Sequence, residues 1–344
     1  KDSVTFSVIN RTGAPIPIPV YGTKKGTMIF KQWLDIEECD STFTVQRKEV
    51  DKIILNLKNE VPEYNLRNNW KKLTGFFPNN RPVKFVFMKD LEDPYYNQIL
   101  YVPTISYNFY DGLTPGIRLH NKTILDKPFI FEINPSYSSK SDNLSGSAIF
   151  VINQNYRNST LYNAKYSMSG SYFHYAQDAT YLKLNPTVQL RIRQPNFRDN
   201  RKQLILFRQV IVNKEKSAFV TENSPENYSV FDARYINTRT EVTNHFNFSS
   251  NIQVSGDFGK VIGELEYRKL FENNRQINLR FYAGSFLYNK TQSDFFSFAL
   301  DRPTDDLIDY NYFGRSESMG LFSQQYIQAE DGFKSKIATP FANK

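Results

Sequence analysis

Residues 242–254 of the chain have the sequence VTNHFNFSSNIQV. Every odd position from Thr243 to Gln253 is polar, whereas most even positions are apolar. Because successive side chains of a strand point to opposite faces, this alternation predicts a strand with one apolar face and one polar face. The run is about 13 residues long, roughly twice the usual length of a strand in a globular protein. Long strands of this kind, repeated in series, are what a transmembrane β-barrel requires.

The same alternation recurs from about residue 103 onward. Apolar residues recur at every second position at 129–133, 148–152 and 277–283, among other stretches. The pattern predicts about eleven or twelve strands, the last and weakest of them at Gly320–Gln328. We therefore expect residues 103–344 to form an antiparallel outer-membrane β-barrel.

Parity assigns side chains to the two sides of this barrel wall. The residues predicted to face lipid are Phe246, Phe248, Ile252, Val254, Leu279 and Phe281. The polar residues predicted to face the lumen are His245, Asn247, Asn251, Glu264, Glu266, Arg268 and Arg280.

Composition agrees with this prediction. The 344 residues include 22 Tyr and 29 Phe, yet the mean hydropathy is negative. In a barrel, aromatic residues form the bands at the membrane interfaces and the polar lumen lowers the average. The net charge is +8, but the Lys and Arg residues form no dense cluster that could follow a phosphate backbone. We therefore expect no nucleic-acid partner.

Connection lengths suggest an orientation. Gly256–Gly259 and Glu272–Arg275 are tight turns, whereas Asn213–Asn227 and Asn289–Tyr312 are long. Bacterial outer-membrane barrels have short turns at the periplasmic end and longer loops outside. The lengths therefore predict one short-turn end and one long-loop end.

Residues 1–70 have a different pattern, which predicts a small β-sandwich from several short strands. The three prolines in Ala14–Val20 cannot donate ladder hydrogen bonds, so we expect this strand at a sheet edge. Residues 71–102 are expected to be a connector. The predicted sandwich core is Phe6, Val8, Trp33, Phe43, Val45, Ile54 and Leu57.

No catalytic or metal-binding residue is predicted in this chain. Its single cysteine, Cys39, excludes a thiolate cluster, and His120, His174 and His245 are far apart in the sequence. Zinc sites need several such ligands at close spacing. We expect the chain to bind no zinc and to be inactive alone as a peptidase.

The N-terminal residues contain several recognisable motifs. They are VTFSVIN at Val4–Asn10, PIPV at Pro17–Val20, Gly26, KQW at Lys31–Trp33 and PEYNLRNN at Pro62–Asn69. In this order the motifs resemble the β-sandwich that follows the catalytic domain of gluzincin aminopeptidases, the aminopeptidase N-like zinc metallopeptidases. Residues 97–120 resemble the start of the barrel fused to such peptidases in Bacteroidetes-type bacteria.

This resemblance implies an outer-membrane region that anchors a metallopeptidase-like domain lying upstream of Lys1. The family's zinc would be bound in that domain. None of the three histidines here begins the family's H-E-x-x-H motif, so no catalytic residue can be carried over. Two alternatives remain open: an independent outer-membrane channel, and a soluble carbohydrate-binding β-protein.

We also expect the barrel to be incomplete within these residues. An open barrel edge in lipid leaves unpaired backbone groups, each at a cost of several kcal/mol. The expected partners are outer-membrane lipid and either further strands or an assembly protein. The latter would bind along Gly320–Gln328 or along Ile99–Phe109.

Overall fold

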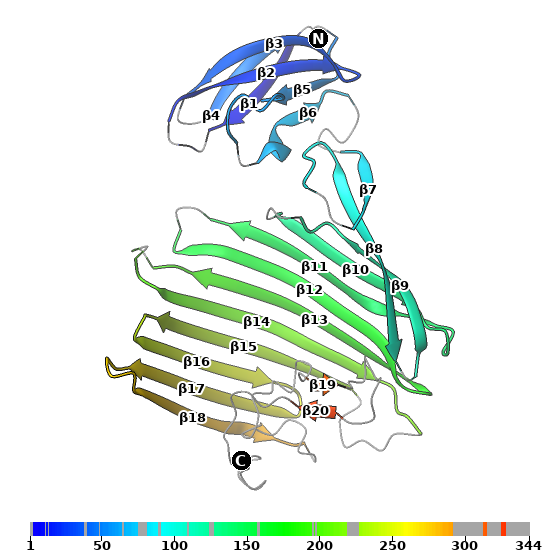
Figure 1. Ribbon diagram of the computed structural model, residues 1–344, viewed down its shortest axis with the longest axis vertical. Helices are drawn as coiled ribbons and strands as arrows, with labels where there is room; N and C mark the ends of the chain where they lie inside the picture. Colours follow the sequence, from blue (N-terminus) through cyan, green and yellow to red (C-terminus); the bar gives the residue numbers. More distant parts are fainter. Residues whose placement is uncertain are drawn as a thin grey trace. The chain divides into compact units, whose positions relative to one another are not determined.

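The computed structural model describes residues 3–291 and two short later segments, 312–314 and 325–327. Within 3–291 the gaps are 11, 13, 38–39, 48, 64, 75–80, 89–90, 109, 124–126, 157–158, 195, 197 and 219–226. Over these residues the chain is all-β (Figure 1), apart from one turn of 3-10 helix at Leu66–Asn68. No helix among them is long and apolar enough to cross a membrane.

The chain divides into two compact units. The first comprises residues 1–85 and 91–99, and the second comprises residues 86–90 and 100–344. The residues expected to form a connector, 71–102, include the end of β6 (Trp70–Lys72), the whole of β7 (Val83–Phe87) and the first half of β8 (Asn97–Asn108).

The first unit is a β-sandwich. One sheet has two strands, β1 (Ser3–Ile9) and β4 (Asp40–Gln46). The other has the order β3 (Thr27–Ile36), β2 (Ile16–Lys24), β5 (Lys52–Leu55), β6 (Trp70–Lys72). Val20, Leu34, Val45 and Ile53 form the core between the sheets, with Phe6 and Phe43 packed against them.

Two expectations about this unit are corrected. Trp33 is not in the core but 50% exposed, because Leu34 and Ile36 take the buried positions of β3. The proline-bearing strand β2 is central rather than at an edge. The part of β2 that contains Pro17 and Pro19 nevertheless pairs with β3 alone, since β5 pairs only with Val20–Thr23. The missing donors of Pro17 and Pro19 therefore cost no sheet hydrogen bonds on that side.

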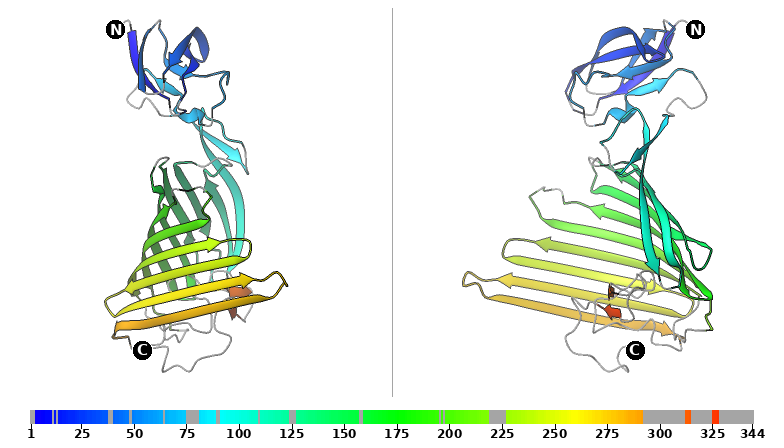
Figure 2. Two further views of the ribbon diagram at one scale, coloured as in Figure 1. Left: turned by 90° about the vertical axis from the view of Figure 1, so that its left-hand side faces the viewer. Right: turned by 45° about the vertical axis from the view of Figure 1, so that its right-hand side comes forward.

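The second sheet has twelve strands in sequential antiparallel order, β7 to β18. Figures 1 and 2 show it as one curved sheet in which each strand lies beside the next. Its strands are β7 (Val83–Phe87), β8 (Asn97–Asn108), β9 (Gly112–His120), β10 (Phe129–Tyr137), β11 (Leu144–Asn155), β12 (Leu161–Ala176), β13 (Ala179–Ile192), β14 (Arg201–Lys214), β15 (Asn227–Thr240), β16 (Asn244–Val254), β17 (Phe258–Leu270) and β18 (Gln276–Asn289).

Among the described residues this sheet does not close on itself, and its edge strands are β7 and β18. Of the two expected seam strands, Ile99–Asn108 lies in β8, and Phe109 is outside the described residues. The short strand β7 lies beside the start of β8, where the Met88 amide donates to the Tyr101 carbonyl. Of Gly320–Gln328, the structure describes only β20 (Gln325–Ile327), which pairs with β19 (Tyr312–Gly314) in a separate ribbon.

The connection lengths do not distinguish the two ends of the sheet. The tight turns β16–β17 and β17–β18 lie at the two ends of the same strand, β17, and so at opposite ends of the sheet. The long connection between β14 and β15 lies at the same end as the β16–β17 turn. The expectation of one short-turn end is therefore wrong for the part of the sheet that the structure describes.

Candidate functional site

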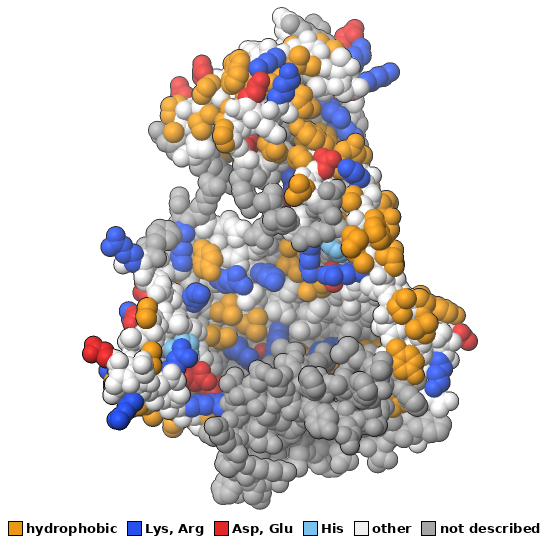
Figure 3. Space-filling model, in the orientation of Figure 1, with side chains coloured by type: hydrophobic (Ala, Val, Ile, Leu, Met, Phe, Trp, Pro, Cys, Tyr) orange, Lys and Arg blue, Asp and Glu red, His pale blue; other side chains and the backbone are white. Residues whose placement is uncertain are grey.

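The two faces of the twelve-stranded sheet differ sharply in chemistry. On one face, here called the outer face, large apolar side chains are exposed from β8 to β18, for example Ile105, Met168 and Phe281. The opposite, inner face carries buried charged and polar side chains, among them Arg208, Asp232 and Lys260. Figure 3 shows Lys and Arg side chains gathered in a hollowed face of the molecule over this sheet.

One inner row crosses β14 to β17 at Arg208, Asp232, Gln253 and Lys260. Arg208 Nε lies 2.6 Å from Asp232 Oδ2, and the two side chains are only 2% and 0% exposed. Gln253 Nε2 donates to the other carboxylate oxygen at 3.3 Å. Buried charges of opposite sign must be paired in this way, because an isolated buried ion is very costly.

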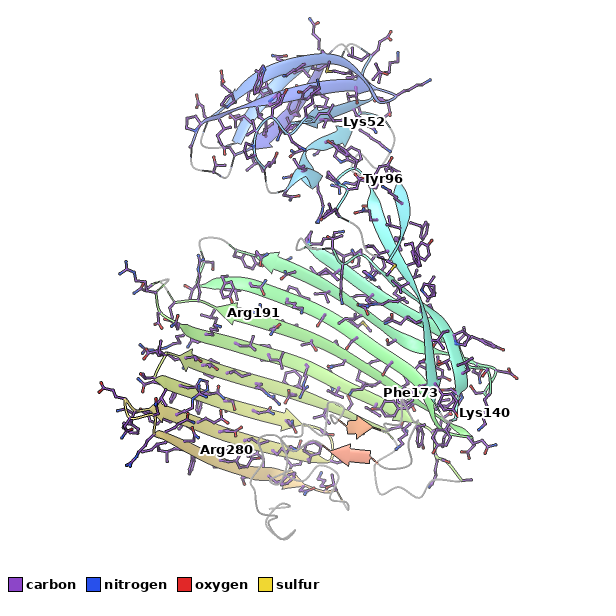
Figure 4. The ribbon with its side chains drawn as sticks, in the orientation of Figure 1. Lys52, Tyr96, Lys140, Phe173, Arg191 and Arg280 are labelled. Carbon is purple, nitrogen blue, oxygen red and sulfur yellow. The ribbon has the colours of Figure 1, made fainter. Side chains whose placement is uncertain are left out.

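A second group lies on the inner face nearer the β18 edge and includes several predicted lumen residues. The guanidinium of Arg280 on β18 (Figure 4) pairs with Glu264 and lies 4.0 Å from Glu266. Glu266 accepts from Asn247 Nδ2 at 3.3 Å, and Asn247 Oδ1 accepts from Thr238 at 2.8 Å. The structure therefore brings four of the predicted residues into one network.

The other predicted lumen residues share the inner face but lie outside this network. Arg268 is the cross-strand neighbour of His245, whose ring nitrogen is 2.9 Å from the Thr240 hydroxyl. Asn251 is buried opposite Arg234 and Ile262.

Sequence reasoning missed two further polar groups near β9 and β10. Glu132 pairs with Arg118 and with Lys122, at 2.9 and 2.6 Å. Asp111, in the β8–β9 turn, accepts from the Ser141 hydroxyl and lies 2.7 Å from His174 Nδ1 on β12. The inner parity of Arg118 and Glu132 was visible in the sequence, whereas the contact from Asp111 to β12 depends on how the turn folds.

The predicted lipid-facing residues all lie on the outer face. Ile252, Val254, Leu279 and Phe281 are exposed there, and Phe281 is 67% exposed. Phe246 and Phe248 are half-buried, and the Phe248 ring lies 6.3 Å from that of Tyr235.

The outer face of β12 carries Ala164, Tyr166, Met168, Gly170 and Tyr172. Eight residues of strand at about 3.3 Å each, tilted by roughly 40°, span about 20 Å along a membrane normal. This is most of the roughly 25 Å height of the apolar band in known transmembrane barrels.

The described residues contain no cluster of three or more His, Cys, Asp or Glu that could hold a metal ion. The three histidines lie on β9, β12 and β16, and each has a ring contact with another group: His120 with the Lys122 amide, His174 with Asp111 and His245 with Thr240. The three described histidines therefore lie in three separate places and do not form one set of metal ligands.

No family model matches the chain, and no curated protein matches it. Among solved structures, the translocation pore of the P pilus usher (PapC) is similar over 82% of this chain and 66% of that one. The sequence identity is 10% and the TM-score is 0.20. This chain thus spans slightly less than two thirds of the usher chain. At this TM-score the similarity supports no conclusion about function.

Proposed function

We propose that the twelve-stranded sheet is the wall of a bacterial outer-membrane β-barrel that anchors the N-terminal β-sandwich at the membrane. The observation that carries this proposal is that the sheet exposes its apolar face and buries its charged face, the reverse of a soluble protein. Phe281 is 67% exposed on one face, whereas Arg208 is 3% exposed on the other. Soluble monomers rarely expose a contiguous apolar patch larger than roughly a few hundred Å². In lipid the outer face is instead the favourable one.

The finer part of the proposal is that this region belongs to a zinc metallopeptidase-like protein. It rests on the sandwich motifs at Val4–Asn10, Pro17–Val20 and Pro62–Asn69. Mass-spectrometric sequencing of the whole polypeptide, recovered from its native membrane with an antibody to the sandwich, tests this part. An H-E-x-x-H sequence in the same polypeptide supports it, and a complete polypeptide without that motif overturns it.

A second candidate function is that of a channel, which is favoured by the charged inner face. Conductance of the purified chain in a planar bilayer would support the channel. A lipid-inserted chain without conductance would favour the anchor.

Reconstitution tests the membrane assignment itself. The chain should insert into phosphatidylcholine vesicles and float with them through a density gradient, even after a carbonate wash. Monodisperse behaviour in buffer without detergent would overturn the assignment and favour a soluble β-protein.

A further inference from the structure

A slot of about 460 Å³ crosses the outer face of the sheet from β10 to β15. Its walls are almost entirely apolar. They include Phe129, Phe150, Ile152, Met168, Val188 and Phe207. The proposed membrane assignment accounts for an apolar face but does not by itself require a hollow in it, so the slot needs an explanation of its own.

The slot coincides with an interruption of the β13–β14 ladder. The two strands pair at Tyr181–Leu184 and again at Thr187–Ile192, but not at Asn185 and Pro186. Pro186, which lines the slot, has no N–H to donate. Opposite it, Gln209 hydrogen-bonds through its side chain to the Ser229 hydroxyl at 2.7 Å. The polar group at the slot is thereby satisfied without a ligand.

Two arginines lie on the same face of the same strands, toward one end. Arg201 on β14 and Arg239 on β15 are direct cross-strand neighbours. Like charges in that position repel each other. Arg239 pairs with Glu241 at 2.7 Å in an exposed contact, which contributes little. The carboxylate of Asp199 accepts from the Arg201 amide, and among the described residues the Arg201 guanidinium has no ion-pair partner.

The spacing between the arginines and the slot suits a lipid. Six residues separate Arg201 from Phe207, about 20 Å along the strand. At a strand tilt of roughly 40° this is about 15 Å of depth. Half of a hydrocarbon core is also about 15 Å thick. Arginines at the headgroup level therefore place the slot near the membrane centre.

We propose that the slot holds one acyl chain of an anionic membrane lipid whose phosphate lies against Arg201 and Arg239. This inference rests on the proposed membrane location of the sheet. The phosphate offsets the repulsion between the two guanidinium groups, and the acyl chain fills apolar space that a loosely packed bilayer would leave partly empty.

Fluorescence quenching tests the site in the full chain. Phe150→Trp places a reporter in the slot, and Phe281→Trp makes the same change on the outer face away from it. Each variant is reconstituted in phosphatidylcholine with increasing amounts of phosphatidylglycerol brominated in its acyl chains. The constant signal of Trp33 and Trp70, both in the sandwich, is subtracted using the unsubstituted chain.

The reporter at position 150 should reach half-maximal quenching at a brominated-lipid fraction roughly fivefold lower, or more, than the reporter at 281, because each interfacial cation favours anionic lipid. Adding Arg201→Gln and Arg239→Gln should abolish this difference. Brominated phosphatidylcholine should show no preference for position 150.

The remaining outcomes separate the two proposals. Equal quenching curves at 150 and 281 overturn the lipid site and leave the membrane assignment standing. A preference that survives both arginine substitutions overturns the role of the phosphate. No quenching of either reporter overturns the membrane assignment itself.

Discussion

Arg208 and Asp232 face each other across β14 and β15 with 2.6 Å between Nε and Oδ2, and neither side chain is more than 2% exposed. The pair lies on the face opposite the exposed apolar band. It therefore marks the inner face as the polar side of the sheet, with both charges fully buried there.

Breaking this pair should be strongly destabilising. Asp232→Asn keeps the shape of the side chain but leaves the Arg208 charge buried without its counter-charge. We expect a loss of about 3–5 kcal/mol in unfolding free energy, measured by urea titration in lipid vesicles. The double variant Arg208→Met with Asp232→Leu is the control and should lose much less. Equal losses in the two variants would show that the charge pairing is not what matters.

Adjacent positions on β16 should respond oppositely to the same substitution. Phe248→Arg puts a charge on the outer face and should cost about 2–4 kcal/mol if that position lies near the bilayer centre. Asn247→Arg should be tolerated, because Asn247 lies on the polar face beside Glu266. The same urea titration compares them, and a larger loss for the Asn247 variant would reverse the assignment of the faces.

Labelling provides an independent measure of the same two faces. In a chain with Cys39→Ser, a cysteine introduced at 247 should react with a water-soluble maleimide, and one introduced at 248 should be protected by lipid. The inverse pattern would contradict the proposed orientation of the sheet.

Acid should weaken the N-terminal sandwich through Glu60. The hydrogen bond from Lys31, and then the one from Tyr21, lower the pKa of the Glu60 carboxyl below its ordinary value. The stabilisation from this group is therefore present above the pKa of the unfolded chain, about 4.3, and is lost as the pH falls through the lower folded-state pKa.

Both tryptophans of the chain lie in the sandwich, so their fluorescence reports its thermal unfolding. The unfolding midpoint should fall less between pH 6 and pH 3 in Glu60→Gln than in the unsubstituted chain. Identical pH profiles would show that Glu60 contributes nothing to the acid response.

The chain should bind no stoichiometric zinc. Its histidines are separated on β9, β12 and β16, and each ring contacts another group. Atomic absorption on protein purified in metal-stripped buffer measures this directly. One equivalent of zinc per chain would contradict the prediction.

Much of the large sheet could be predicted because alternation is a local property of the sequence. The run from Phe246 to Val254 gave both the strand and its apolar face, and the register with β15 and β17 keeps that parity. The predicted number of strands agrees with the twelve observed, but partly by chance. The sheet includes β7, which was expected in the connector, whereas the described part of Gly320–Gln328, β20, pairs with β19 in a separate ribbon.

What could not be predicted depends on contacts that are distant in the sequence. Trp33 has the size and apolarity of a core residue, but the packing of β3 on the opposite sheet buries Leu34 instead. The contact between Asp111 and His174 joins positions 63 residues apart, across two intervening strands. Alternation of apolar and polar residues predicts the face on which a side chain lies. It does not predict which distant strand a turn will contact.

The interruption at Pro186 has a mechanical consequence for the sheet. On the two sides of Asn185 and Pro186, the β13–β14 ladder consists of separate hydrogen-bonded segments. The sheet can therefore change its curvature along this line without breaking any other ladder bond between these two strands. The β9–β10 ladder has a similar gap at Asn134 and Pro135. If the curvature of the sheet adjusts to its surroundings, the adjustment should be largest along these two interrupted ladders.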